Sequence, residues 1–279
     1  MTVPGGLSVV IPTRNRRAQL ERCLRSLDAG ADVEIVVVDQ SDAPLRAADL
    51  PRPVVVHRLP VPQVAVARNA GALRARTAFV AFLDDDVIVE PGWTAAVAAA
   101  IADDLAPAAV FGAVLPDAGP GLPYCEVAHP DPRRFHRLTL PWEIGGSANL
   151  VIDRFLLLSM GGFPPGARPS GEDSYLILRL LRAGHEVLFH PGMRVRHERS
   201  SPVARAVSRG PHGLGMGRVL RRSAAEGDRW ALAVAAVAAL AQLRQLAAGD
   251  PQMRLEGQTY IRPFLRGLTE GRRGWFERD

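Results

Sequence analysis

Three adjacent acids that follow an apolar run constrain this chain more than any other feature. Residues 78–83 are apolar or aromatic without alternation, which is typical of a strand buried on both faces of a sheet. The next three residues are Asp84, Asp85 and Asp86, and neighbouring carboxylates need a cation or strong hydrogen-bond donors. Ligands of open α/β sheets bind beyond such strand ends, and Asp84 and Asp86 project to one side, where they could share a divalent metal with a phosphate ligand. The alternative is an acidic turn that caps a helix beginning near Trp93.

The order of the expected elements predicts an α/β fold with a Rossmann-like, mostly parallel sheet flanked by helices. Strands are predicted over residues 7–11, 34–39, 54–56 and 78–83, and helices over residues 63–76 and 92–105. Strands that alternate with helices favour parallel pairing through right-handed crossovers. Residues 145–152 are expected to turn sharply and re-enter the sheet.

The character of the sequence changes after residue 201. Residues 1–201 carry the strand and helix pattern, whereas residues 202–279 are rich in alanine and arginine and predict a helical C-terminal extension. The apolar segment 230–241 is shorter than the roughly 20 residues that span a bilayer. We therefore expect it to pack against the core or to lie on a membrane surface. Residues 116–141 are rich in Pro, Gly, His and Arg and predict a functional loop.

The amino-acid composition limits the classes of molecule that this protein is expected to bind. The 34 basic residues are all arginine and, with 29 acidic residues, give a net charge of +5, which favours phosphate-bearing ligands or an anionic membrane surface. The arginines are dispersed, so we predict no binding to nucleic acid. Cys23 and Cys125 form neither a metal-binding pattern nor a disulfide framework, which suits a reducing compartment. Residues 1–6 lack the pattern of a signal peptide, so we expect a cytoplasmic protein, with peripheral contact at the inner face of the membrane as a further expectation.

Five short motifs occur in an order that resembles a known family. They are Val-Val-Ile-Pro-Thr-Arg-Asn-Arg at 9–16, Val-Val-Asp at 37–39, Ala-Arg-Asn-Ala-Gly at 67–71, Phe-Leu-Asp-Asp-Asp at 82–86 and Gly-Glu-Asp at 171–173. Each motif is weak alone, but five in this order resemble the GT-A glycosyltransferases, specifically the large inverting family 2 often called rhamnosyltransferase-like. The resemblance covers about residues 7–200 and implies that residues 1–201 form a GT-A domain. The helices beyond it match no motif of the family.

The resemblance implies a nucleoside-diphosphate sugar as donor and a divalent metal ion, Mn²⁺ or Mg²⁺, as cofactor. Such hard cations prefer oxygen ligands, and they stabilise the charge that grows on the leaving diphosphate. Asp86 is implied as a metal ligand, and Asp84 as a contact to the ribose or a second ligand. Asp85 belongs to the same Asp-x-Asp motif of the donor site. His197 is placed to complete the metal shell, with a surface histidine as the alternative.

The same resemblance implies a set of contacts to the nucleotide. Asp39 corresponds to the acid that hydrogen-bonds the nucleobase, and a strand-end turn is the alternative. The family's usual second acid is replaced by glutamine in the next position, which leaves the identity of the base open. Pro12, Thr13 and Arg14 would line the other side of the base. Arg68 corresponds to an arginine that approaches the pyrophosphate or the base, and a solvated helix face is the alternative.

Inversion requires a base that removes the proton from the acceptor hydroxyl. Asp173 is the family's usual choice, and Glu172 is the second candidate. Both are expected at a helix N-terminus, where the helix dipole keeps a carboxylate ionised but weakens it as a base. The alternative is a capping box in which Ser170 is the N-cap and Asp173 its partner three residues on.

Four further residues are implied on the sugar or acceptor side. Gly145, Gly146 and Asn149 lie where related enzymes form the floor under the donor sugar or the acceptor. Trp142 could stack on a sugar face, with packing in the core as the alternative. The acceptor is left open as a glycan, a lipid-linked compound or a small molecule, and the extension is left open as a membrane contact, a homodimer interface or a source of stability.

Three other functions compete with an inverting, metal-dependent transferase. A retaining GT-A enzyme would keep the same donor site. A nucleotidyltransferase would show a glycine-rich loop with a basic residue after the first strand, where this chain has Pro-Thr-Arg-Asn. The third alternative is a catalytically inactive scaffold of the same fold that binds nucleotide sugars, against which the intact acids argue.

Overall fold

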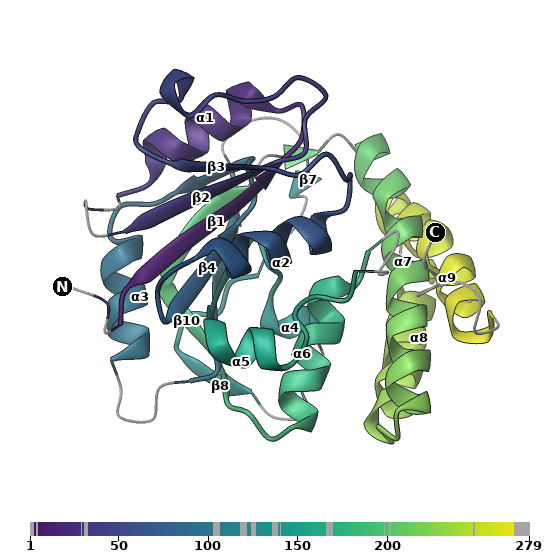
Figure 1. Ribbon diagram of the computed structural model, residues 1–279. Coiled ribbons are helices and arrows are strands. Elements are labelled where there is room, and N and C mark those ends of the chain that lie inside the picture. The colour runs from purple at the N-terminus through teal and green to yellow at the C-terminus, as the bar shows by residue number, and fades with distance from the viewer. Residues whose placement is uncertain are drawn as a thin grey trace.

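The computed structural model shows an α/β core with a helical extension along one side (Figure 1). It describes the chain apart from residues 1–2, 4, 29, 31–32, 103–106, 118–121, 124–126, 136–138, 140, 166–169, 198, 201, 248 and 271–279. The strands are β1 Leu7–Thr13, β2 Glu34–Asp39, β3 Val55–Arg58, β4 Phe79–Leu83, β5 Val87–Val89, β6 Ala109–Pro116, β7 Leu122–Pro123, β8 Arg133–Phe135, β9 Asn149–Asp153, β10 Val187–His197 and β11 Arg199–Ser200. The helices are α1 Arg17–Ser26, α2 Val64–Arg74, α3 Trp93–Ile101, α4 Pro141–Ile144, α5 Arg154–Ser159, α6 Glu172–Arg182, α7 Pro202–Ala225, α8 Trp230–Leu246 and α9 Pro251–Thr269.

Nine of the described strands form a mixed sheet in the order β3-β2-β1-β4-β9-β6-β10-β5, with β8 paired to β10, and β7 and β11 form a separate two-stranded sheet. β1 is parallel to β2 and β4, and β3 continues this parallel half beyond β2. β9 is antiparallel to both of its neighbours, β4 and β6, because the chain turns sharply before it and re-enters the sheet. The predicted α/β fold with a helix-flanked sheet is confirmed.

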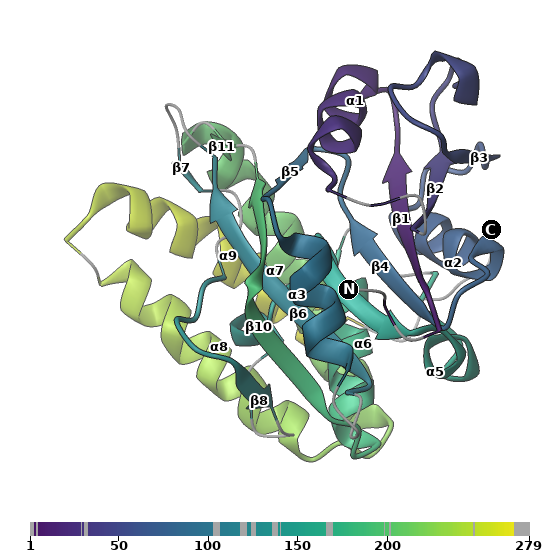
Figure 2. The same cartoon turned by 90° about the vertical axis from the view of Figure 1, so that its left-hand side faces the viewer.

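Helices cover both faces of the sheet, which explains why β4 is apolar along its whole length. Figures 1 and 2 show α1 and α3 on one face and α2, α5 and α6 on the other. Each layer has its own core, so every residue of β4 is buried. α2 lies especially close to β1, since a Cβ on Gly71 would come within 2.2 Å of Val10 Cγ1.

Several strands end in polar residues at the same edge of the sheet. β1, β2 and β4 are parallel, so their carboxyl ends meet at this edge, and the acidic turn at residues 84–86 follows β4 directly. β10 brings its own carboxyl end to the same place, where His197 pairs with Val87 of β5. β10 is continuous from Val187 to His197 but has a register shift between His190 and Arg194, since Pro191 lacks an N–H for the ladder.

The extension is a compact group of three described helices that packs on α6. Its core joins side chains of α7, α8 and α9 to Tyr175 and Leu178 of α6. α7 and α9 approach very closely, because a Cβ on Gly217 would lie 2.2 Å from the carbonyl oxygen of Phe264. On another side of α7, a Cβ on Gly215 would lie 2.3 Å from the carbonyl oxygen of Ser170. The predicted C-terminal helices are therefore present and joined to the core by backbone-close contacts.

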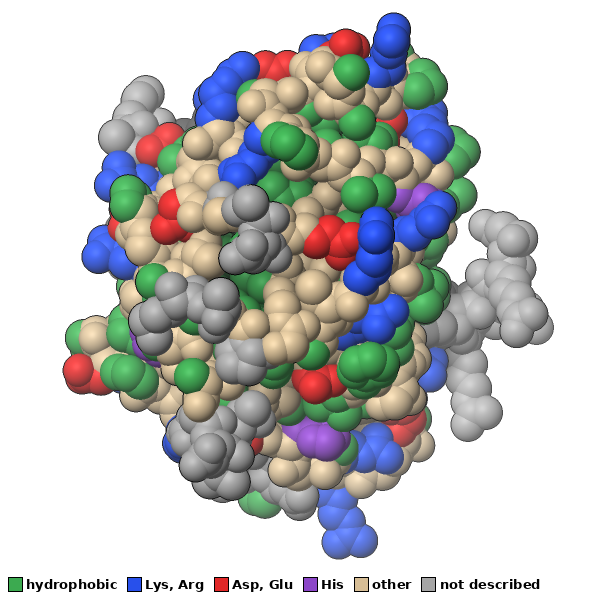
Figure 3. Space-filling model, turned by 60° about the vertical axis from the view of Figure 1, so that its left-hand side comes forward, with side chains coloured by type: hydrophobic (Ala, Val, Ile, Leu, Met, Phe, Trp, Pro, Cys, Tyr) green, Lys and Arg blue, Asp and Glu red, His purple; other side chains and the backbone are tan. Residues whose placement is uncertain are grey.

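The apolar segment 230–241 lies in α8 and has two different faces. Val234 and Ala238 are buried in the extension, whereas Leu232 and Leu240 on the opposite face are 66% and 56% exposed. Among the described helices, none combines the length and the hydropathy that crossing a membrane requires. On the face that comes forward in Figure 3, acidic and basic side chains are interspersed among apolar and uncharged ones.

Candidate active site

A cavity of about 740 Å³, which we call the first cavity, opens at the edge where the polar strand ends meet. It is lined by Pro12, Thr13, Arg14, Asn15, Arg16, Gln40, Pro62, Val64, Arg68, Asp84, Asp85, Asp86 and His197. The structure thus brings together eight residues that the sequence analysis singled out. The other five were not predicted as site residues: Asn15 and Arg16 come directly after the predicted Arg14, Gln40 comes after Asp39, and Pro62 and Val64 are remote from any predicted residue except Arg68.

Asp84, Asp86 and His197 form a group that can hold a metal ion. One ligating atom of each lies within 4.8 Å of the others. His197 is only 6% exposed, which excludes a surface histidine, and its Nε2 lies 3.4 Å from Oδ1 of Asp86. That buried oxygen has no hydrogen-bond partner among the described residues. Two carboxylates and one imidazole suit Mn²⁺ or Mg²⁺, so the residues present fit a divalent cation.

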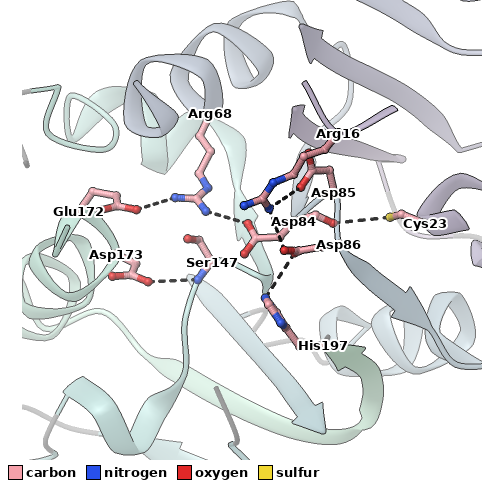
Figure 4. Close-up of polar contacts among 10 residues, drawn as sticks. All are labelled: Arg16, Cys23, Arg68, Asp84, Asp85, Asp86, Ser147, Glu172, Asp173 and His197. Carbon is pink, nitrogen blue, oxygen red and sulfur yellow. Dashed lines mark hydrogen bonds and ion pairs between the residues drawn. The ribbon is translucent and has the colours of Figure 1, made fainter. Parts of the chain in front are cut away.

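Asp85 anchors the acidic turn to β1. Thr13 Oγ1 donates to Oδ2 of Asp85 at 2.7 Å. Arg16 Nη1 lies 3.3 Å from the other oxygen of Asp85 and 2.8 Å from Asp86 Oδ2 (Figure 4). Burial raises the pKa of Asp85 to about 6, and the neighbouring acids add to this, while Thr13 and Arg16 oppose it. The acidic turn is therefore held by a hydrogen bond from Thr13 and by the positive charge of Arg16.

Arg68 connects the acidic turn to the start of α6 (Figure 4). Its Nη2 donates to Asp84 Oδ1 at 2.9 Å, and its Nη1 donates to Glu172 Oε1 at 2.8 Å. The guanidinium carbon lies 5.6 Å from the ring centre of Phe163, and the residue is 4% exposed, which excludes a solvated helix face. Burial acts to lower the pKa of Arg68, but the charges of Asp84 and Glu172 outweigh it and raise the pKa.

The start of α6 differs from the capping box that the sequence offered as an alternative. The N-cap is Gly171, whose φ of 105° is left-handed, and no side chain caps the helix. Ser170 Oγ donates instead to the carbonyl oxygen of Pro211 in α7, at 3.2 Å. Glu172 and Asp173 are therefore the first two residues of the helix, and Asp173 does not form a capping box with Ser170.

Glu172 and Asp173 are neighbours in different surroundings. Glu172 is 8% exposed and pairs with Arg68, and burial, with the charge of Asp173, raises the pKa of Glu172 despite this cation. Asp173 is less buried, and its Oδ1 accepts from Ser174 N at 2.7 Å. Its Oδ2 lies 3.4 Å from Ser147 N (Figure 4) and would be 3.1 Å from a Cβ on Gly146. Glycine thus leaves room beside the carboxylate of Asp173.

Asp39 holds a loop together and does not line the first cavity. It is fully buried, and its oxygens accept from Ser41 N and Leu45 N at 2.9 Å each and from Arg58 Nη1 at 3.0 Å. Burial favours the neutral acid, but these hydrogen bonds and the Arg58 charge outweigh it and lower the pKa of Asp39. Gln40, the next residue, lines the cavity, and the nucleobase contact of Asp39 stays a prediction.

Asn149 is buried in the core. The residue is fully buried, and Trp93 Nε1 donates to its Oδ1 at 2.9 Å. Its Nδ2 donates to the carbonyl oxygens of Ala113 at 3.0 Å and Met193 at 2.8 Å. These three bonds use both donors of the amide and tie β9 to α3, β6 and β10. The expected contact of Asn149 to a sugar stays a prediction.

The remaining residues expected on the acceptor side lie around the loop before β9. Gly145 has a φ of 140°, and a Cβ there would be 3.0 Å from Phe111 Cδ1. Gly146 lies beside Asp173, as described above. Trp142 is in α4, but its side chain is outside the part of the chain that the structure describes.

Comparison with known proteins finds similarity to glycosyltransferases. The family model described as glycosyl transferase family 2 matches residues 8–143. The pre-mycofactocin glycosyltransferases of two strains of Mycobacterium tuberculosis are each 30% identical over 217 residues, which cover 73% of this chain and 45% of the relative. The chain thus spans less than half the length of these curated relatives.

Two solved structures share the fold at low sequence identity. S. aureus TarS 1–349 in complex with UDP has a TM-score of 0.59 and 18% identity, and the match covers 96% of this chain and 73% of that chain. GalNAc-T7 with UDP, GalNAc and Mn²⁺ has a TM-score of 0.55 and 21% identity over 69% of this chain and 43% of that chain. The chain has the GT-A fold and belongs to glycosyl transferase family 2, whose model matches residues 8–143.

Proposed function

We propose that the protein is a metal-dependent glycosyltransferase that moves a sugar from a nucleoside-diphosphate donor to an acceptor hydroxyl with inversion. The observation that carries the proposal is the group of Asp84, Asp86 and His197 in the wall of the first cavity. Family membership supports the reaction class. A carboxylate suitable as a base, Asp173, lies next to Glu172, which Arg68 joins to the same group.

The first cavity would bind the nucleoside diphosphate. A divalent cation held by Asp84, Asp86 and His197 would supply positive charge that stabilises the departing diphosphate. Arg16 offers a second cation at this place, because its side chain is 53% exposed and can turn from the acids toward a phosphate. Thr13 and Gln40 line the cavity toward the strand ends and suit contacts to the nucleoside.

The proposed reaction is one displacement at the anomeric carbon. The acceptor oxygen forms a bond to this carbon while the bond from the carbon to the diphosphate oxygen breaks. The electron pair of the broken bond leaves with the diphosphate, and the hydroxyl proton passes to the carboxylate of Asp173. Asp173 suits this role better than Glu172, because Glu172 is already paired with the buried Arg68.

Calorimetric titration with UDP, GDP and dTDP, each with and without Mn²⁺, tests the donor site. We expect one nucleotide to bind tightly only with the metal. The variant Asp86→Ala should weaken this binding by about 100-fold, since a metal ligand is lost. Asp49→Ala removes an exposed acid outside the cavity and is the matched control. Equal binding by Asp86→Ala and the control would refute the metal site.

The stereochemical outcome is tested separately. Once titration has named the nucleotide, ¹H NMR of the sugar released by slow donor hydrolysis, or transferred to an acceptor, gives the anomeric configuration before it equilibrates. We expect the configuration opposite to that of the donor. The same configuration as the donor would instead support a retaining enzyme with the same donor site.

We also propose that residues 1–201 and 202–279 are separate units of a cytoplasmic protein, with α8 in peripheral contact with a membrane. The exposed leucines of α8 support the contact, because an apolar helix face favours an interfacial position. Co-sedimentation with vesicles of anionic and of zwitterionic lipid tests this proposal. Absence of the protein from both pellets would contradict it.

A further inference from the structure

A second cavity, of about 430 Å³, lies between the core and the helical extension. Its core wall includes Glu172 and Asp173, and its other wall includes Gln242 and Gln245 of α8 and Tyr260 of α9. The ion pair between Arg68 and Glu172 separates the two cavities, since Arg68 lines the first and Glu172 the second. A group bound in the second cavity can therefore reach Asp173 from the side opposite to the first cavity.

One part of this second cavity is apolar. Met216 of α7 is 9% exposed, Tyr260 is 7% exposed and Ala238 of α8 is 3% exposed, and all three line the space. Their buried positions show that the wall is a packed surface and not a gap between mobile side chains. An apolar or aromatic body would gain the free energy of leaving water by packing against it.

Two amides in the same wall require partners. Gln242 and Gln245 stand one helical turn apart on α8, and Gln242 is 7% exposed. The Oε1 atom of each is buried and has no hydrogen-bond partner among the described residues. A buried amide oxygen without a partner costs about 1–3 kcal/mol. The last torsion of glutamine has a broad energy minimum, so each amide can turn toward a ligand that brings an N–H or O–H donor.

The charged groups around the cavity disfavour an anion. Asp173 and Glu172 lie on the core wall, and an added anion beside two carboxylates would be repelled. Arg209 of α7 is the cation of this cavity, but its Nε lies 3.8 Å from Glu256 Oε2 and its guanidinium lies 4.9 Å from the ring centre of Tyr260. The positive charge of Arg209 is therefore already partly balanced by Glu256 and by the ring of Tyr260. Burial lowers the pKa of His212, which also lines the cavity, and the imidazole adds no charge near neutral pH.

We propose that the second cavity is the acceptor site and that the acceptor is a small, uncharged molecule. Its reactive hydroxyl would lie at Asp173, its apolar or aromatic body against Met216 and Tyr260, and its N–H or O–H donors against Gln242 and Gln245. The proposal rests on the proposed function and adds to it the class of acceptor and the residues of the extension that select it. It excludes polysaccharides and lipid-linked phosphates as preferred acceptors.

A matched pair of probes tests the chemistry of the site without knowledge of the donor sugar. 4-Hydroxyphenylacetamide and 4-hydroxyphenylacetate have the same shape, but the first is neutral and carries N–H donors, whereas the second is an anion. Binding of each to the full chain is measured by ligand-observed NMR in the presence of Mn²⁺ and the nucleotide identified by titration. We expect the amide to bind at least about 10-fold more tightly. Equal or tighter binding of the acetate, or tighter binding of maltotriose or a polyprenyl phosphate, would overturn the proposal.

Variants on α8 locate the binding. The double variant Gln242→Leu with Gln245→Leu should weaken binding of the amide probe by about 30-fold, since two hydrogen bonds of about 1 kcal/mol each are lost. Ala241→Phe fills the cavity and should abolish binding, whereas Ala236→Phe places the same ring on the exposed face of α8 and should leave it unchanged. Thermal melts identify a variant that does not fold, in which case the double variant alone decides.

The two proposals can fail separately. Nucleotide binding in the first cavity is measured on every variant and is expected to stay at the level of the unmodified chain. Intact nucleotide binding together with no effect of Ala241→Phe on the amide probe would remove the acceptor site and leave the transferase. Loss of metal-dependent nucleotide binding in the unmodified chain would remove the transferase itself.

Discussion

The two cavities on either side of the Arg68–Glu172 pair are built in different ways. The first is formed mainly by residues at or just beyond strand ends, and charged side chains dominate its wall. The second is formed largely by side chains from α7, α8 and α9, and amides and apolar groups dominate its outer wall. Under the proposed function, the parallel sheet edge would supply charge for a diphosphate, whereas the packed helices would supply the shape that fits the acceptor.

The largest effect is expected at the boundary between the two cavities. Asp173→Asn keeps the shape of the side chain but removes the base, so transfer should fall by about 1,000-fold. Metal-dependent nucleotide binding should be unchanged, because Asp173 does not line the first cavity. Transfer rates and calorimetric titrations on the same preparation check this. Normal turnover would move the base role to another group.

Next in size is the loss of the ion pair that separates the cavities. Arg68→Met leaves Glu172 buried without its cation, which should lower the free energy of unfolding by about 3 kcal/mol. Urea denaturation measures the change, and Arg74→Met, at an exposed position of the same helix, is the control. Adding Glu172→Gln to Arg68→Met should recover part of the loss. No recovery would mean that the pair with Asp84 carries the effect.

A smaller effect is expected for Asn149, which lies in the core and lines neither cavity. Asn149→Ala removes three hydrogen bonds and leaves Trp93 Nε1 without its acceptor, so stability should fall by about 2 kcal/mol. Nucleotide binding should stay the same. If titration instead showed weaker binding at unchanged stability, the residue would contact substrate after all.

The smallest effect is expected on the outer face of α8. Leu240→Ala changes a side chain that is 56% exposed, and its effect on the free energy of unfolding should stay within about 0.5 kcal/mol. Neither cavity should be altered. A loss above about 1 kcal/mol that grows with protein concentration would reveal that a second copy of the chain covers this face in solution.

Much of the first cavity could be predicted because its chemistry is local in the sequence. Asp84 and Asp86 directly follow a strand that reads as buried, and strand and helix alternation places the ends of β1 and β4 together. His197 lies beside these acids as well, and its burial against Asp86 depends on the antiparallel pairing of β10 with β5. The end of a buried strand can therefore indicate a ligand site even when the other strands that form the site are distant in the sequence.

The sequence did not reveal how Asp39 and Asn149 are held. The family resemblance implies that both contact a ligand, but in this structure their polar atoms form hydrogen bonds with other parts of the fold. Sequence alone does not reveal whether a polar group is already satisfied within the fold. The second cavity was not predicted, because Gln242 and Gln245 look like ordinary helix residues in the sequence. Only the packing of α8 against the start of α6 shows that they line one cavity with Asp173.

The contact between Gly215 and Ser170 limits how this protein can be re-engineered. The carbonyl of Ser170 immediately precedes Gly171 and the proposed base, and it lies against the backbone of α7. A chimera that exchanges residues 202–279 for another helical module would have to present a glycine at this point. Any larger residue would displace the turn before Asp173 and, under the proposed function, lower the rate of transfer without changing a side chain of the proposed site. If the second cavity is the acceptor site, acceptor choice is therefore easier to alter by substitution along α8 than by exchange of the whole module.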